Sequence, residues 1–173
     1  MLILRFLEPK DEATFLEALA EDWAGFSFAH YYEMGMSIAQ YLKQLESKRT
    51  GSGLIGDEVP STFLFAFIPG ENGRDRCAGR VSIRHHLNKM LASVGVHIGY
   101  AVRLNDRKKG YATEILGHAL TILKMIGVDR ALVTCDDTNL GSVRTIERNG
   151  GYLESTVLDP VSGIPKRRYW IRL

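Results

Sequence analysis

One stretch near the middle of the chain, Gly99–Thr113, constrains the fold more than any other part of the sequence. A polar turn at Arg103–Asp106 and a basic segment ending at Gly110 separate a predicted strand from a long amphipathic helix. The first N–H groups of a helix lack partners within it and lie at the positive end of its dipole, so they bind anions. The sequence therefore predicts a phosphate site between this strand and helix. The apolar row that predicts the strand is Val94, Val96, Ile98, Tyr100 and Val102.

Length and composition limit the class of protein. A chain of 173 residues is long enough for one domain with a proper core, and a net charge of +2 is too small to indicate nucleic-acid binding. Cys77 and Cys135 fit neither a disulfide framework nor a metal site, and the five histidines show no metal-ligand spacing. No apolar run is long enough to span a bilayer, and the first residues do not resemble a signal peptide. We therefore expect a single cytoplasmic domain, residues 1–173, with no metal and no membrane or nucleic-acid partner.

Hydrophobic periodicity predicts an α/β fold with a central mixed, mostly antiparallel sheet and helices on both faces. A helix is expected to begin near Pro9, and another to follow Gly110. The segment His85–Leu91 is expected to be a connector. The other predicted strands and helices are Leu2–Phe6, Ser37–Lys48, Thr62–Ile68, Ala78–Arg84, Arg130–Cys135, Leu140–Arg148, Tyr152–Val157 and Lys166–Leu173.

Residues 51–56, GSGLIG, match the G-x-G-x-x-G pattern of dinucleotide-binding loops. That interpretation requires a strand before the glycines and a helix after them. Here a polar helical segment precedes the pattern, and Asp57-Glu58-Val59-Pro60 follows it. A flexible loop is therefore the favoured interpretation.

Two motifs together resemble those of a known superfamily. The R-x-x-G-x-A pattern of Arg107–Ala112 is similar to the acyl-CoA pyrophosphate loop of the GNAT superfamily of N-acyltransferases. Downstream, Asn139-x-x-Ser142 and the run Ile146–Tyr152 resemble a second segment of that family, with one additional glycine before the tyrosine. The resemblance covers about a third of the chain. It implies a GNAT-like domain that transfers an acetyl group from acetyl-CoA to a primary amine by direct attack in a ternary complex.

The same resemblance implies which residues bind acetyl-CoA. Backbone N–H groups from Lys108 through Thr113 would hold the pyrophosphate, and backbone groups of the strand that precedes the turn would pair with the pantetheine arm. Asn139 and Ser142 would contact that arm near its sulfur, although Asn139 could also be only the N-cap of a helix. The full set is Tyr100, Ala101, Val102, Arg107, Lys108, Lys109, Gly110, Tyr111, Ala112, Thr113, Asn139 and Ser142.

The catalytic residues are less clearly marked. Many relatives have a tyrosine seven residues after the asparagine as an acid for the leaving thiolate, but this chain has Ile146 there. A thiol pKa of about 8.5 means that the thiolate needs little protonation, so Ser142 or a water is expected to suffice. His97 is a candidate base, with a structural histidine as the alternative. Cys135 could form an acyl-enzyme, with simple apolar packing as its alternative.

The acceptor amine is not identified by the sequence. The aromatic stretch Trp23–Tyr32, with Glu21, Asp22 and Glu33 nearby, would suit a cationic amine, and loop packing explains it equally well. The acceptor could be a small molecule or a peptide, and a homodimer is left open. Two other functions are a non-catalytic acyl-CoA-binding regulator, which the absent tyrosine supports, and a module for another nucleotide, which would lack the P-loop lysine motif.

Overall fold

The structure is a computed structural model and describes residues 2–21, 23, 27–160 and 162–173. Within these residues the strands are β1 (Ile3–Arg5), β2 (Ser61–Ile68), β3 (Arg76–Arg84), β4 (Ile98–Val102), β5 (Arg130–Asp136), β6 (Tyr152–Leu158) and β7 (Pro165–Arg172). The α-helices are α1 (Glu12–Leu19), α2 (Ile38–Thr50), α3 (Lys89–Val94), α4 (Tyr111–Met125) and α5 (Leu140–Arg148). The predicted order of elements is confirmed, with α3 as an addition. Short 3₁₀ turns occupy Pro9–Asp11, Glu71–Gly73 and Leu104–Asp106.

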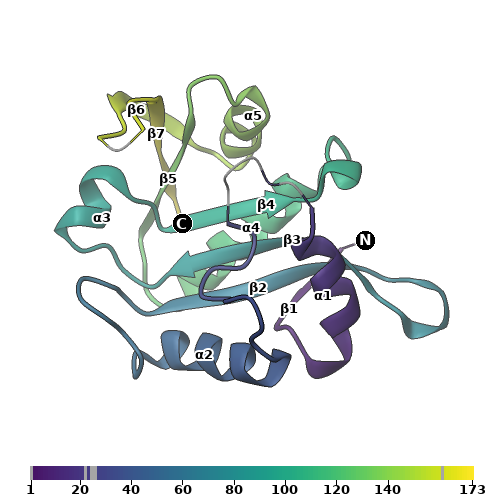
Figure 1. Ribbon diagram of the computed structural model, residues 1–173. Coiled ribbons are helices and arrows are strands. Elements are labelled where there is room, and N and C mark those ends of the chain that lie inside the picture. Colours follow the sequence, from purple (N-terminus) through teal and green to yellow (C-terminus); the bar gives the residue numbers. More distant parts are fainter. Residues whose placement is uncertain (1, 22, 24–26, 161) are drawn as a thin grey trace.

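The strands form two antiparallel sheets (Figure 1). The first has the order β1-β2-β3-β4, and the second has the order β5-β7-β6. Both predicted hairpins, β2–β3 and β6–β7, are present. The α/β class is confirmed, and the expected central sheet is divided into two halves that meet between β4 and β5.

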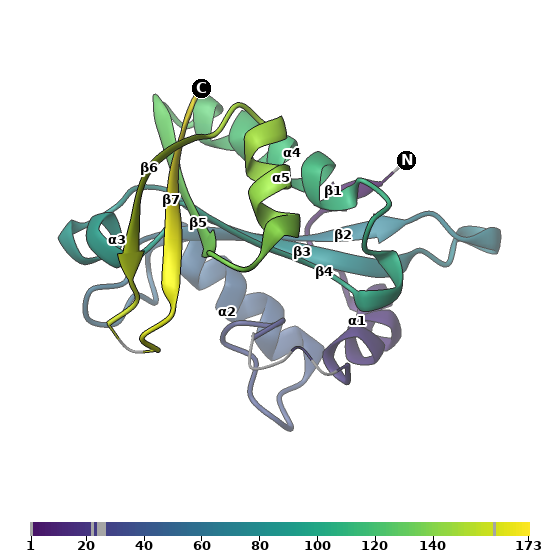
Figure 2. The ribbon, with the colours of Figure 1, turned by 90° about the horizontal axis from the view of Figure 1, so that it is seen from above.

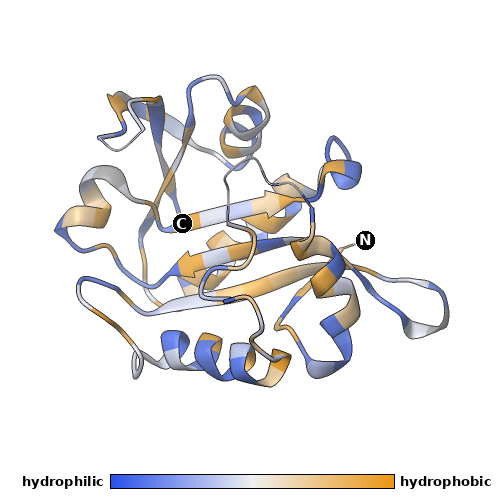
Figure 3. Ribbon diagram, in the orientation of Figure 1, coloured by the Kyte–Doolittle hydropathy of each residue, from blue (hydrophilic) through white to orange (hydrophobic). Residues whose placement is uncertain are grey.

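Helices cover both faces of the first sheet. Figure 2 shows α4 and α5 on one side of the sheet and α1 and α2 on the other. Successive residues of a strand point to opposite faces, so Phe63 and Phe65 of β2 pack in the core below α1 and α2 while Leu64 and Ala66 pack in the core below α4. Figure 3 shows the result, with apolar strands enclosed between helices that carry polar residues outward. No helix in the described part of the chain is long and apolar enough to cross a membrane.

Local signals explain where the helices begin and end. Ser37 and Gln40 form a capping box at the start of α2, and Gly51, with φ of 81°, terminates it in the left-handed conformation. Residues 51–56 form the loop between α2 and β2, as expected for the GSGLIG segment. Gly127, with φ of 86°, follows the end of α4 and allows the chain to turn toward β5.

The helix α3 corrects two expectations. Residues 89–94 are helical, so the alternating apolar row that was expected to begin at Val94 is a strand only over Ile98–Val102. The predicted connector His85–Leu91 also contains the start of this helix. The physical reason is a cap, because the Asn88 side chain accepts a hydrogen bond of 2.8 Å from the Leu91 N–H. A short capped turn therefore overrides an alternating pattern.

The two sheets meet at His97, immediately before β4. The His97 N–H donates to the Leu132 carbonyl of β5 at 2.8 Å, and the Leu132 N–H donates to His97 Nδ1 at 2.9 Å. Beyond this point β5 rises steeply away from β4 (Figure 1), and no strand of the described chain pairs with that edge of β4. His97 thus lies where the two strands are joined, and we call the separation between the backbones of β4 and β5 beyond this point the gap.

Close packing of β3 against β4 gives a first prediction. A Cβ at Gly79 would lie 2.5 Å from the Ala101 carbonyl oxygen. We expect Gly79→Ala to lower the free energy of unfolding by about 1–3 kcal/mol, measured by urea denaturation. Gly141→Ala is the control, because its Cβ would meet Asn139 Oδ1 at 3.5 Å, an ordinary contact. Equal stabilities of the two variants would contradict the close approach of β3 and β4.

The bond to His97 Nδ1 gives a second prediction. Burial lowers the pKa of His97 to about 4, from an ordinary value of about 6.5. The unfolded chain therefore takes up a proton first, so stability is full above about pH 6.5 and falls as the pH drops toward 4. Burial lowers the pKa of His30 to about 4 as well, so both histidines contribute in this range.

We expect His97→Gln, which removes the titrating ring, to show a shallower loss of stability between pH 6.5 and 4.5 than the unmodified protein. Urea denaturation at several pH values measures the slope. His30→Gln provides a comparison that leaves the contact between the sheets intact. An unchanged slope in His97→Gln would show that the ring is not buried in its neutral form.

Candidate functional site

The turn between β4 and α4 presents a run of backbone donors. Lys108 and Gly110 have positive φ values of 63° and 87°, and Gly110 is the N-cap of α4. The N–H groups of residues 108–112 donate no hydrogen bond to any described residue. The Thr113 N–H, which we expected to belong to this run, donates to the Gly110 carbonyl at 3.0 Å. Five consecutive N–H groups at a helix N-terminus form an anion site.

A buried carboxylate holds this turn in place. Asp106 is 1% exposed and accepts two hydrogen bonds from the Arg76 guanidinium, at 2.6 and 2.8 Å. These bonds lower the pKa of Asp106. Lys109 Nζ also donates to Asp106 at 3.1 Å, and Arg107 Nε donates to the Val102 carbonyl at 3.1 Å. Of the three consecutive basic residues, Lys108 is therefore the one whose ammonium bonds to no described residue.

The edge of β4 that faces the gap carries unpaired backbone groups. In the ladder with β3, the Arg84 N–H donates to the His97 carbonyl, and the Arg103 N–H donates to the Ala78 carbonyl. Every second residue of an antiparallel strand directs its N–H and C=O toward the same neighbouring strand. Since His97 and Arg103 bond to β3, Ala101 also directs its N–H and C=O toward β3. Tyr100, one residue earlier, points them into the gap. Of the three strand residues predicted to meet a ligand, Ala101 is thus the one whose backbone faces away.

The start of α5 lies on the other side of the gap. Asn139 caps this helix, because its Oδ1 accepts a hydrogen bond of 3.0 Å from the Ser142 N–H. Ile146, at the position where a tyrosine was missing, is completely buried. The structure brings Ser142 of α5 and Tyr100 of β4 together, although the sequence gave no sign of this contact.

The hydroxyl of Tyr100 is buried and unpaired. No described atom meets the geometry of a hydrogen bond to it. Burial raises the pKa of Tyr100 to about 12, and the nearby Ser142 and Thr145 hydroxyls oppose this rise. A buried hydroxyl without a well-aligned partner costs about 1–3 kcal/mol, so a ligand group that bonded to it would recover part of this cost.

The candidate base His97 and the candidate nucleophile Cys135 are both buried. His97 is 6% exposed, its Nδ1 accepts the Leu132 N–H, and burial keeps the ring neutral at pH 7. This geometry favours the structural alternative over a base. Burial also raises the pKa of Cys135 to about 11, which favours apolar packing over a reactive thiolate.

The aromatic segment before α2 serves mainly as core. Phe28 stacks on Trp23 with ring centroids 4.4 Å apart and packs against Phe65 of β2. Glu21 forms an ion pair with Arg103 at 2.6 Å, so the charge of its carboxylate is already compensated. Asp22 and residues 24–26, which we also considered for an acceptor pocket, lie outside the described residues.

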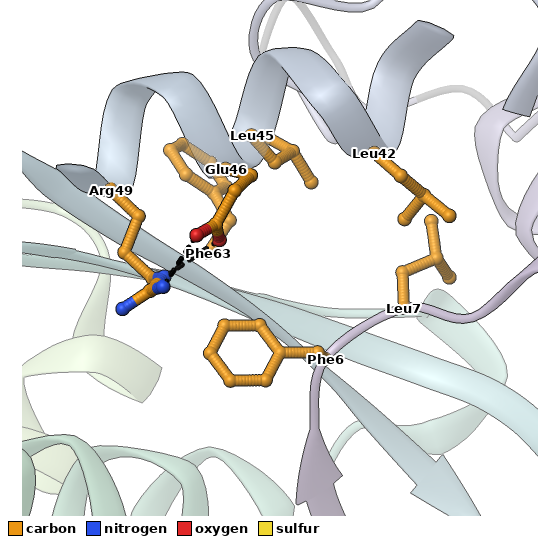
Figure 4. Close-up of a pocket in the computed structure, with 7 residues that line it drawn as sticks. All are labelled: Phe6, Leu7, Leu42, Leu45, Glu46, Arg49 and Phe63. Carbon is orange, nitrogen blue, oxygen red and sulfur yellow. Dashed lines mark hydrogen bonds and ion pairs between the residues drawn. The ribbon is translucent and has the colours of Figure 1, made fainter. Parts of the chain in front are cut away.

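A cavity of about 160 Å³ beside α2 carries no catalytic groups (Figure 4). Apolar side chains form most of its wall, and the charged residues that line it, Glu46 and Arg49, pair with each other at 2.5 Å. Its lining residues are Phe6, Leu7, Leu42, Leu45, Glu46, Arg49 and Phe63. No group of three or more His, Cys, Asp or Glu side chains in the described part of the chain is placed to hold a metal.

Solved structures share this architecture. A Salmonella typhimurium acetyltransferase, yncA, solved with acetyl-CoA, is 13% identical and covers 99% of this chain and 94% of its own, with a TM-score of 0.62. The ribosomal-protein N-acetyltransferase RimL, solved with coenzyme A, is 15% identical, with coverages of 99% and 94% and a TM-score of 0.67. A spermidine N-acetyltransferase chimera from Vibrio cholerae and hSSAT is 18% identical, with coverages of 99% and 95% and a TM-score of 0.61. At these identities the likeness concerns the fold.

The sequence itself identifies the family. No curated protein sequence matches the chain. The family model described as the acetyltransferase (GNAT) domain matches residues 1–151, which include the N–H run, the gap beside β4 and α5. The chain therefore belongs to the GNAT acetyltransferase family and is an acyltransferase.

Proposed function

We propose that this protein transfers an acetyl group from acetyl-CoA to a primary amine by direct attack in a ternary complex. The observation that carries the proposal is the run of five N–H groups at residues 108–112, which opens beside the unpaired edge of β4. An elongated ligand with a phosphate at one end and amide groups along its arm matches both features. Holding donor and acceptor together would supply most of the rate acceleration.

In this proposal the pyrophosphate of acetyl-CoA binds the N–H groups of residues 108–112, with the Lys108 ammonium beside it. The pantetheine arm follows the gap and bonds to the backbone of Tyr100 and Val102. The thioester end then lies between β4 and α5, near Asn139 and Ser142. His97 enters as the residue that joins β4 to β5 at one end of the gap, in place of the base role that we considered.

The leaving thiolate requires a hydrogen-bond donor, and Tyr100 is well placed to provide it. Its hydroxyl lies next to Ser142 and has no described partner. A phenol of pKa about 12 keeps its own proton, and the negative charge of the thiolate strengthens the hydrogen bond that it accepts. A thiolate of pKa about 8.5 needs no more than this. We therefore propose that Tyr100 and Ser142 together replace the tyrosine that is absent at Ile146.

The rival function is a non-catalytic acyl-CoA-binding regulator. Its specific support is the completely buried Ile146 at the position of the usual acid. Both functions require acetyl-CoA binding, whereas only the enzyme releases free thiol when an amine is present. Titration calorimetry with acetyl-CoA, CoA and ATP, followed by a thiol-release assay over a panel of amines, separates the two. Binding without thiol release for every amine would favour the regulator.

Two glycines at opposite ends of α4 allow a matched test of the anion site. Gly110 and Gly127 have φ values of 87° and 86°, and nothing lies within 4 Å of a Cβ at either position. We expect Gly110→Asp to weaken acetyl-CoA binding by roughly 100-fold or more, because a carboxylate repels the pyrophosphate. Gly127→Asp carries the same backbone strain and should leave affinity unchanged by calorimetry. Equal affinities of the two variants would reject the site.

Two tyrosines allow a matched test of the leaving-group donor. Tyr100 and Tyr41 both have a buried hydroxyl without a described hydrogen-bond partner. We expect Tyr100→Phe to lower kcat by roughly 10- to 100-fold while acetyl-CoA affinity is retained. Tyr41→Phe, on the buried side of α2, should leave kcat unchanged. If Tyr100→Phe has full kcat, the thiolate is stabilised by another donor.

A further inference from the structure

A second cavity, of about 360 Å³, lies where β2 begins and β3 ends, on the left of Figure 1 beside α3. Ser61 and Arg84, which are paired partners in these strands, both line it. The segment between α1 and α2 contributes His30 and Tyr31 to its wall. The remaining lining residues are Ile55, Asp57, Glu58, Val59, Met90 and Leu91.

Arg84 is the unusual residue of this cavity. Its side chain is half-buried, and its guanidinium forms no ion pair with any described residue. By contrast, the partly buried Arg5, Arg103 and Arg168 each pair with a carboxylate at 2.6 to 2.8 Å. Desolvating a cation without a counter-charge is unfavourable, and burial accordingly lowers the pKa of Arg84. The cavity therefore contains a positive charge that the described protein leaves uncompensated.

Two nitrogens of the Arg84 guanidinium remain available as hydrogen-bond donors. Nη1 donates to the Val96 carbonyl at 3.1 Å, whereas Nε and Nη2 donate to no described residue. Neither of these two nitrogens is among the buried polar atoms that are sealed from solvent. Nε–H and Nη2–H lie side by side on the guanidinium, and this fork matches the two oxygens of a carboxylate.

The carboxylates that line the cavity do not fill this role. Glu58 accepts hydrogen bonds from Lys48 Nζ at 2.5 Å and from the Ile55 N–H at 2.8 Å. Asp57 is exposed to solvent and forms no ion pair with a described residue. Ser61 also lines the cavity, but its hydroxyl is sealed from solvent. The donors that the cavity offers to an anionic group are therefore Nε and Nη2 of Arg84.

Arg84 forms hydrogen bonds that connect the wall of the cavity to the residues before β4. The Arg84 N–H donates to the His97 carbonyl at 2.7 Å, and its Nη1 contacts the preceding residue, Val96. His97 is also where β4 and β5 are joined. His30 and Tyr31 come from the α1–α2 side of the sheet, opposite α4 (Figure 2). The wall of the cavity thus extends to the residues that precede β4, on the α1–α2 side of the sheet.

We propose that the amine acceptor carries a carboxylate, and that Arg84 binds this carboxylate in the cavity. The inference rests on the proposed acetyl transfer and names the class of its acceptor. It departs from the cationic acceptor that the sequence suggested, because Glu21 is paired with Arg103 while Arg84 is not paired. The aminated end of the same molecule would then extend along Val96 and His97 toward the gap.

The test compares primary amines that differ only at the distant group. The probes are γ-aminobutyrate, its carboxamide and putrescine. We expect the unmodified protein to acetylate the carboxylate with a kcat/KM roughly 10- to 100-fold above that of the matched carboxamide. Arg84→Gln should remove this preference by raising KM for the carboxylate, and Arg84→Lys should restore part of it. Arg74→Gln, which changes an exposed arginine of the β2–β3 loop, is the control.

A binding measurement makes the test independent of turnover. Calorimetric titration of each probe into the protein saturated with CoA should show binding of the carboxylate that Arg84→Gln abolishes and Arg74→Gln retains. Equal use of carboxylate and carboxamide, preference for putrescine, or no carboxylate binding at all would overturn the inference. Acetyl-CoA titration of the same variants reports on the proposed function separately, because Arg84 does not contact the N–H run. Failure of the unmodified protein to bind acetyl-CoA would reject the proposed function. Titration of the carboxylate probe would then still show whether Arg84 binds a carboxylate.

Discussion

Two hydrogen bonds between His97 and Leu132 hold the two sheets together at one point, and among the described residues no strand pairs with β4 further along this edge. A strand edge with unpaired N–H and C=O groups is usually covered or blunted, since it would otherwise pair with another chain. Here α5 lies across the gap, and its Ser142 approaches Tyr100 of β4. The gap is thus a built feature of the fold, fixed at one end by the bonds between His97 and Leu132.

The two ends of β4 carry different electrostatics. Beyond its C-terminal end lie the N–H run of residues 108–112 and the Lys108 ammonium, next to the buried Asp106 that Arg76 holds. Before its N-terminal end, a neutral buried histidine and the Arg84 guanidinium lie within two hydrogen bonds of each other. One strand therefore connects two positive regions that lie on opposite faces of the sheet. The acetyl-CoA binding that we propose rests on the first region, and the acceptor class that we infer rests on the second.

Much of this fold follows from local patterns. The stripes of α2, α4 and α5 have clear 3.6-residue periods, and the bounds predicted for α5 were those observed, Leu140–Arg148. The glycine turn before α4 was predictable because helix ends have fixed chemical needs. The helix α3 was missed because its last residue, Val94, continues the alternating row of Val96 and Ile98, and a short helix has too few residues for a period to emerge. Arg84, Tyr100 and the His97–Leu132 contact join residues far apart in sequence, so no local pattern could indicate that these side chains lack, or find, a partner.

The placement of the helices in layers has a kinetic consequence. The sheet separates the α4 side from the α1–α2 side (Figure 2), and the two candidate ligand routes lie on these two sides. With the ligands bound as proposed, neither would lie in the other's path. The layered fold would then allow the two substrates to bind, and the two products to leave, in either order.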